Sequence, residues 1–172
     1  MELTTDRRND HPDSRAEADR ARTVIARVAL LLLAVAALYQ GVWAQLAPRS
    51  FYESFPGGMG WVATEGPFNE HLVRDVGGLV NGLAVVAIVA AWTLSRPLVL
   101  ANALGWLVYG VPHLVFHLAH PLDGASSQAT NVAVLAGEIV LPLVGLLAVF
   151  GRREPRPLVS SHRDHAGAAR TR

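Results

Sequence analysis

Two histidines, His113 and His117, stand four residues apart in a long apolar stretch of the sequence. On a helix this spacing places both imidazole rings on one face, as a chelated metal ion requires. A third histidine, His71, and the carboxylates of Asp75 and Glu138 occur elsewhere in the chain and would complete a ligand shell from other helices. Imidazole and carboxylate ligands without thiolate suit zinc, iron or copper(II). The pattern therefore predicts a metal site, or a haem held by His71 opposite His113 or His117.

The same residue types allow three other interpretations. A carboxylate at membrane depth beside a helix-breaking proline, as at Glu138 and Pro142, is typical of transport or proton-relay pathways. A purely structural network is also consistent with the pattern, because ion pairs that only stabilise a fold use the same groups. A third interpretation is an accessory subunit that packs on a partner through Gly78 and Gly82. The sequence has no nucleophile elbow, phosphate loop or H-E-x-x-H motif, so it offers little evidence for an enzyme.

A second group of ionisable residues follows Asn69, which is placed to cap a helix. Two acid–base pairs in this group have members four residues apart, so each pair is within reach on one helical face. These pairs and the polar residues near them share stripes that we expect to face the interior of a bundle. The candidate ligand or relay residues are therefore Glu70, His71, Arg74, Asp75, Asn81, Tyr109 and Glu138, beside the metal candidates His113, His117 and His71.

The distribution of charge indicates which elements position these residues. The chain has 172 residues, of which 51% are hydrophobic and only 17% charged. Four runs with almost no charge each reach the roughly 20 residues that cross a hydrocarbon core of about 30 Å. The absence of cysteine excludes disulfides and thiolate ligands. We therefore expect an all-α, four-transmembrane-helix bundle with spans at about 24–46, 70–94, 98–120 and 128–150, between disordered cytoplasmic tails at 1–23 and 151–172.

The third span carries a row of polar and aromatic residues. Measured from His113, five side chains lie within about 40° of its direction on a helical wheel: Asn102, Trp106, Tyr109, His117 and His120. Such a row on an apolar helix faces the interior of a bundle. Asn131 and Glu138 share one stripe of the fourth span. We expect the polar groups of spans two, three and four to converge in the half of the bundle that lies outside the cytoplasm.

The connection between the first two spans, residues 47–69, is rich in glycine, proline and aromatic residues. Interleaved aromatic residues are typical of segments that lie at the level of the lipid headgroups. Ser50 and Glu53 fit a capping box, which predicts a short interfacial helix or loop beginning there. The segment is either a plain tether or a lid over the site.

Arginine placement predicts the orientation. Arginines flank the start of the first span, the turn at Arg96 and the end of the fourth span, whereas the opposite side has only Arg49 and Arg74. The positive-inside rule therefore places both termini in the cytoplasm of a bacterial cell, with the bundle in the inner membrane. The expected partner is the lipid bilayer, with a second copy or a partner membrane subunit as an alternative and no nucleic acid.

Three segments carry a resemblance to a known family. They are Ala47-Pro-Arg-Ser-Phe-Tyr52, Asn69-Glu-His-Leu-Val-Arg-Asp-Val-Gly-Gly78 and Val111-Pro-His-Leu-Val-Phe-His117. This pattern resembles a family of small four-span integral membrane proteins of unknown function from actinobacteria. By span count and length alone, the chain is more loosely similar to DoxX-like proteins. The resemblance covers about residues 25–150 and implies the four-span architecture, and it implies no activity.

Overall fold

The structure, a computed structural model, describes residues 12–152 and contains helices without any strand in that range. Four of the helices are long and apolar enough to cross a membrane. An all-α bundle with four candidate membrane spans is therefore confirmed. In chain order the elements are α1 (Pro12–Leu46), α2 (Pro48–Ser54), the 3-10 helix η1 (Trp61–Thr64), α3 (Glu70–Thr93), α4 (Arg96–Ala119) and α5 (Ala125–Phe150).

The last three long helices closely follow the predicted spans, and Asn69 caps α3 as predicted by accepting a hydrogen bond from the backbone N–H of Leu72. The first helix differs. Residues 12–23, which we predicted in a disordered tail, are helical. This segment is rich in alanine and arginine, which favour helix, and Asp19 pairs with Arg22 at 3.6 Å. The remaining tail residues, 1–11 and 153–172, lie outside the described residues.

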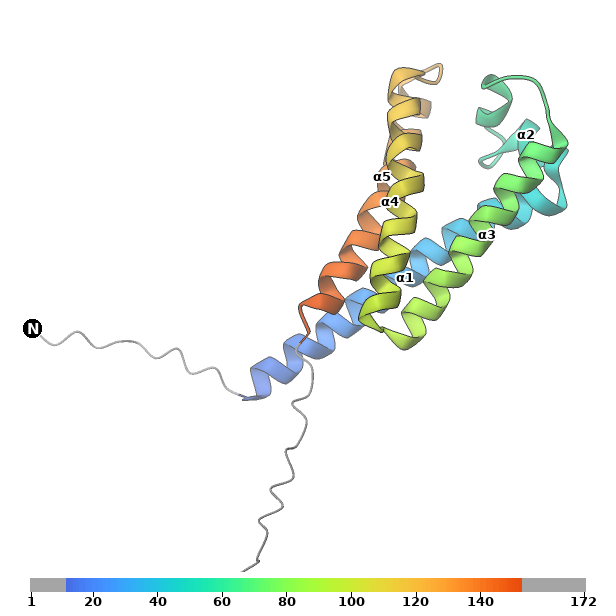
Figure 1. Cartoon of the computed structure of the whole chain (residues 1–172). Helices are drawn as coiled ribbons and strands as arrows, with labels where there is room; N and C mark the ends of the chain where they lie inside the picture. Colours follow the sequence, from blue (N-terminus) through green and yellow to red (C-terminus); the bar gives the residue numbers. More distant parts are fainter. Residues whose placement is uncertain (1–11, 153–172) are drawn as a thin grey trace, which may run out of the picture.

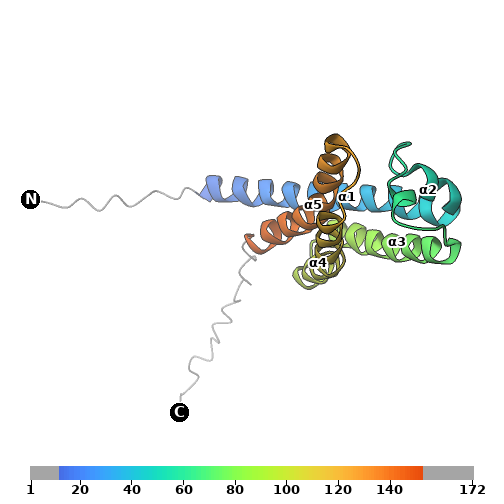
Figure 2. The same cartoon turned by 90° about the horizontal axis from the view of Figure 1, so that it is seen from above.

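The four long helices form two pairs, α1 with α3 and α4 with α5. Figures 1 and 2 show that the pairs meet near the turn between α3 and α4 and diverge toward the opposite end, where α2 and η1 lie. We call the end near the α3–α4 turn the turn end, and the end with α2 and η1 the loop end. Near the turn end one core cluster joins all four long helices, and it includes Leu30, Ala90, Val99 and Val149. The chain is therefore closed at the turn end and splayed at the loop end.

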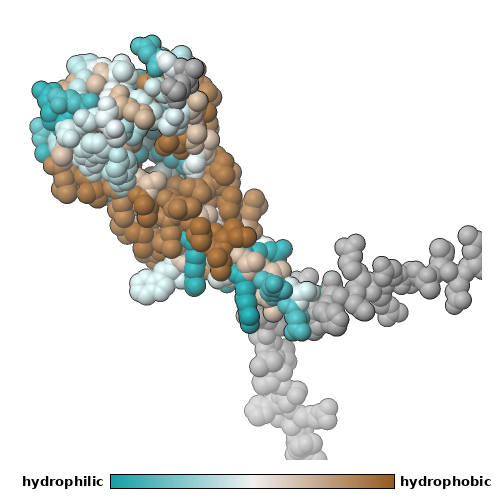
Figure 3. Space-filling model, turned by 180° about the vertical axis from the view of Figure 1, so that it is seen from behind, coloured by the Kyte–Doolittle hydropathy of each residue, from teal (hydrophilic) through white to brown (hydrophobic). Residues whose placement is uncertain are grey.

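Small residues fill the contacts between helices, and large apolar residues face outward. Ala84 and Ala87 of α3 are completely buried, whereas Leu79 and Trp92 of the same helix are largely exposed. Lipid gives no hydrophobic drive for one helix to pack on another, so close backbone approach between small residues supplies the attraction. Figure 3 shows the resulting apolar surface around the middle of the molecule, with hydrophilic residues gathered at both ends.

The closest approach between α1 and α3 occurs at Gly41 and Gly77. A Cβ atom on Gly77 would lie 2.8 Å from the backbone nitrogen of Gln45 and 2.8 Å from the carbonyl oxygen of Gly41. Gly78 and Gly82, predicted as a packing face for a partner, do not make this contact. In the described bundle Gly82 has open space at its Cβ position, and a Cβ on Gly78 would meet only the Gln45 side chain. Packing of a partner on Gly78 and Gly82 stays a prediction.

The segment between α1 and α3 folds back over the loop end. α2 begins at Pro48 and has no side-chain cap, so the predicted capping box at Ser50 is wrong. Proline suits the first turn of a helix because it has no N–H to satisfy. The Ser50 hydroxyl instead accepts a hydrogen bond of 3.2 Å from the Trp43 indole, and Glu53 pairs with Arg49 at 3.3 Å. The bond to Trp43 joins α2 to α1, and α2 packs against α1 and α3, so the segment lies on the α1–α3 side of the splayed end.

Candidate functional site

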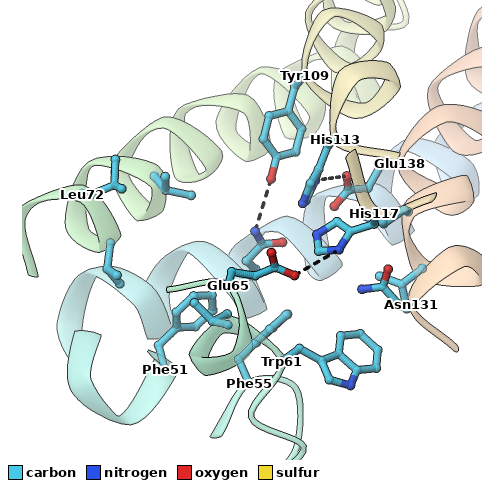
Figure 4. Close-up of a pocket in the computed structure, with 16 residues that line it drawn as sticks. Phe51, Phe55, Trp61, Glu65, Leu72, Tyr109, His113, His117, Asn131 and Glu138 are labelled. Carbon is cyan, nitrogen blue, oxygen red and sulfur yellow. Dashed lines mark hydrogen bonds and ion pairs between the residues drawn. The ribbon is translucent and has the colours of Figure 1, made fainter. Parts of the chain in front are cut away.

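A cavity of about 250 Å³ lies between the two diverging helix pairs at the loop end. Figure 3 shows a hollow at the border between the loop end and the apolar body. Figure 4 shows the cavity with the rings of α2 and η1 on one side and polar side chains of α4 and α5 on the other. Its lining residues are Gln40, Phe51, Phe55, Trp61, Val62, Glu65, Leu72, Val73, Val76, Tyr109, His113, His117, Asn131, Val134, Leu135 and Glu138.

The polar wall begins with three residues of α4 that stand a turn apart. Tyr109, His113 and His117 stack along the helix, with ring centroids 5.1 Å apart for the first two and 5.0 Å for the two imidazoles. The Tyr109 hydroxyl also accepts a hydrogen bond of 3.4 Å from the amide nitrogen of Gln40 on α1. Of the row predicted for this helix, Tyr109, His113 and His117 line the cavity, and Asn102 and Trp106 are buried without lining it. His120, at the end of the row, is exposed and bonds only to its own helix.

Glu138 of α5 lies opposite His113. Its carboxylate oxygen Oε2 is 3.4 Å from Nδ1 of His113, which is within ion-pair range. Gly110 lies at this contact, where a Cβ would be 3.5 Å from the Cβ of Glu138 and 3.3 Å from Ile139, so the helices pack closely here. Glu138 is only 9% exposed, so its charge needs a partner inside the protein. The α4–α5 contact therefore positions one acid–base pair on the cavity wall.

A second acid–base pair joins η1 to α4. Oε1 of Glu65, which follows the 3-10 helix, lies 3.7 Å from Nδ1 of His117. Figure 4 shows Glu65 reaching across from the loop toward the imidazole. Glu65 was not among the residues predicted from the sequence, because an irregular segment has no periodicity that assigns a direction to a side chain. The available signal was that Glu65 is the only acid between Glu53 and Glu70, within an aromatic segment.

Two buried acceptor atoms on the cavity wall have no hydrogen-bond partner among residues 12–152. They are Oδ1 of Asn131, a residue that is 4% exposed, and Oε2 of Glu138. Buried acceptors in folded proteins almost always have a donor, and an unpaired one costs about 1–3 kcal/mol. Both atoms belong to residues that line the cavity. The wall thus presents acceptors to whatever enters.

The charged start of α3 does not join this cavity, contrary to our prediction. His71 pairs with Asp75 at 3.3 Å and its side chain is 89% exposed. Arg74 donates a 2.9 Å hydrogen bond to Glu70 and a second one to the backbone carbonyl of Gln45 on α1. Neither pair lines the cavity within the described chain. Each acid already has a base one turn away, so nothing draws these side chains inward.

Asn81 serves the α1–α3 contact and is absent from the cavity wall. Its amide nitrogen donates a 3.1 Å hydrogen bond to the side-chain oxygen of Gln45, next to the close approach of Gly41 and Gly77. Asn81 was a candidate ligand or relay residue in the sequence. In the structure it is a polar link between two helices, of the kind that stabilises helix pairs in membranes.

The metal candidates are only partly brought together. His113 and His117 are neighbours on the wall, but His71 lies on the exposed start of α3. Across residues 12–152 no group of three or more histidine, aspartate or glutamate side chains is arranged to hold a metal ion. The two imidazoles face one carboxylate each, in two separate pairs. The described residues thus bring together two of the three predicted metal ligands.

Comparison with protein-family models, with curated proteins and with solved structures found no match to this chain. The resemblance to the four-span actinobacterial family therefore stays a prediction.

Proposed function

We propose that this chain is a multi-pass membrane protein that binds a small organic ligand in the cavity at its loop end. One observation carries the proposal: a single cavity takes lining residues from all six helices, and polar side chains gather on one wall of it. Ligand sites are typically apolar clefts with a few convergent polar groups. An apolar side with Phe51 and Phe55 opposite His113 and Glu138 has this composition.

We also propose which membrane holds the bundle and which end of the bundle faces the cytoplasm. Arg22 and Arg96 lie at the turn end, where they donate to the backbone carbonyls of Gly151 and Arg152. The loop end has Arg49 and Arg74, each paired with a glutamate. The excess of arginine at the turn end supports a cytoplasmic location for that end. The cavity then belongs to the outer half of a bacterial inner membrane.

Ligand binding is tested with fluorinated benzyl compounds and fluorine NMR. The protein is purified in detergent and titrated separately with fluorobenzyl alcohol, fluorobenzylammonium and fluorobenzoate. At least one compound is expected to bind the native chain and to lose binding in Leu135→Trp, which fills the cavity. The matched control is Leu79→Trp, which places the same ring on the outer face of α3, where Leu79 is largely exposed. If none of the compounds binds, or if Leu135→Trp binds them all unchanged, the proposal fails.

A second candidate function, proton relay in a small transporter, is favoured by the order of the ionisable groups. Glu138, His113, His117 and Glu65 follow one another from the middle of α5 to the loop, with the two pairs at 3.4 and 3.7 Å. Chains of acidic and imidazole groups carry protons in membrane pumps and transporters. Glu138→Gln should abolish a pH-driven flux in proteoliposomes, and Glu70→Gln should leave it intact. Equal flux in both variants would refute the relay.

A further inference from the structure

We propose that the ligand of this cavity is an organic cation, an aromatic or alkyl molecule that carries an ammonium group. The inference rests on the proposed binding function and adds the chemical class of the ligand. Three independent features of the wall support it: the sign of its charges, its unpaired acceptors and its aromatic rings.

The charges on the wall favour a cation. The lining residues include two glutamates, Glu65 and Glu138, and no arginine or lysine. The histidines His113 and His117 are neutral unless they take up a proton, whereas a carboxylate is charged unless it takes up one. An anionic head group would meet two carboxylates without any permanent positive charge. In a low-dielectric site this arrangement disfavours anions strongly and attracts cations.

Two acceptor atoms on the wall lack a hydrogen-bond donor. Oε2 of Glu138 and Oδ1 of Asn131 accept no hydrogen bond within the described chain, although Nδ1 of His113 lies in ion-pair range of Glu138 at 3.4 Å. Nδ1 of His113 and of His117 likewise have no hydrogen-bond partner there. An ammonium group has several N–H donors and no acceptor, so it can donate to either of the two acceptor atoms. A bond from a charged donor to a carboxylate is also about twice as strong as a neutral one. A carbonyl or ether head group would leave these acceptors unpaired.

The rest of the cavity suits the apolar part of such a molecule. The rings of Phe51, Phe55 and Trp61 stand opposite the polar wall, and aromatic faces attract ammonium groups as well as apolar ones. Three lining residues are exposed: Leu72 at 60%, Val134 at 49%, and Glu65. The exposed part of the lining therefore combines two apolar side chains with one carboxylate. A molecule with an apolar body and a single positive charge matches both this exposed part and the wall.

The experiment compares fluorobenzylammonium, fluorobenzyl alcohol and fluorobenzoate on the native chain in detergent, by fluorine NMR. The ammonium compound and the alcohol have nearly the same size and both donate hydrogen bonds, so their difference reports charge. We expect the ammonium compound to bind most tightly and the carboxylate least. Glu138→Gln should weaken the ammonium compound by a factor on the order of ten, because it removes a charged acceptor, and should leave the alcohol nearly unchanged.

Two further variants keep the result interpretable. Glu53→Gln removes a glutamate of α2 that is exposed and lies outside the cavity, so it should change no affinity. If Glu138→Gln does not fold, as judged by circular dichroism and gel filtration, Glu65→Gln must instead reduce the preference for the ammonium compound over the alcohol. If the alcohol or the carboxylate binds the native chain as tightly as the ammonium compound, the cation assignment is overturned while ligand binding stands. If no compound binds, the proposed function itself fails.

Discussion

Two regions of this molecule contain ionisable residues at the same helical spacing, and only one of them lines the cavity. At the start of α3, Glu70 with Arg74 and His71 with Asp75 stand four residues apart and pair with each other at 2.9 and 3.3 Å. On α4, His113 and His117 have the same spacing. They pair with Glu138 of α5 and with Glu65, which follows η1.

The difference lies in the residue types at the paired positions. An acid and a base one turn apart satisfy each other, so they can stay on an exposed face and contribute a few tenths of a kcal/mol. Two imidazoles one turn apart are both bases, so neither can pair with the other. Each needs a partner from another element. Like residues at this spacing therefore indicate a tertiary site, and complementary residues indicate a local pair. This distinction separates the cavity from the charged start of α3.

The largest expected effect comes from a substitution that pushes α3 away from α1. The contact between these helices keeps the charged start of α3 apart from the cavity. Gly77→Leu places a side chain against the backbone of Gly41 and Gln45, where a Cβ atom alone would lie 2.8 Å from each. We expect the free energy of unfolding to fall by an amount near or above the upper end of the ~1–3 kcal/mol typical of overpacking. Unfolding in mixed detergent micelles measures it. Gly82→Leu is the control, since a Cβ there meets nothing within 4 Å. Equal losses in the two variants would contradict the described contact.

The next effect compares the two regions directly. His113→Ala removes the partner of Glu138, leaving a largely buried carboxylate unpaired, and should lower the free energy of unfolding by about 1–3 kcal/mol. His71→Ala removes an imidazole that is almost fully exposed, so the change should stay within roughly 0.5 kcal/mol. Both values come from the same detergent unfolding measurement. A loss in His71→Ala as large as that in His113→Ala would show that the start of α3 is buried after all.

A smaller, local effect is expected where the loop segment meets α4. His117→Ala removes the partner of Glu65, which forms the contact between the end of η1 and the α4–α5 side. The backbone amides of 61–65 should then exchange with deuterium faster, because less interaction energy holds the segment closed. The backbone amides of α2 serve as the internal reference, because α2 packs on α1. Unchanged exchange in 61–65 would mean that the Glu65–His117 pair holds nothing.

The smallest effect belongs to the exposed pair itself. Glu70→Gln should cost about 0.3–0.5 kcal/mol of unfolding free energy at low ionic strength, and less at high salt. A loss of several times this size, insensitive to salt, would place Glu70 in a buried network and erase the contrast with Glu138.

The helices and the inward row of α4 were predictable because they depend on local patterns. Long uncharged runs place the spans, and the polar row on α4 predicts which face turns inward. The cavity depends on contacts between distant segments. Which carboxylate reaches which imidazole is decided by how the loop folds back and by the close packing of α5 at Gly110. Glu65 could not be assigned because it lies in an irregular turn, and Gly77 was missed because Gly78 and Gly82 fit a familiar motif one residue away.

The most direct test of the account uses the absence of cysteine from the chain. Val134→Cys introduces a single thiol at an exposed position in the lining of the cavity, and Asp75→Cys introduces one at the start of α3. Both variants are labelled with a maleimide in detergent, with and without benzylammonium. The account predicts that the cation slows labelling at position 134 and leaves position 75 unchanged. Equal rates with and without the cation at position 134, or protection at position 75, would contradict it.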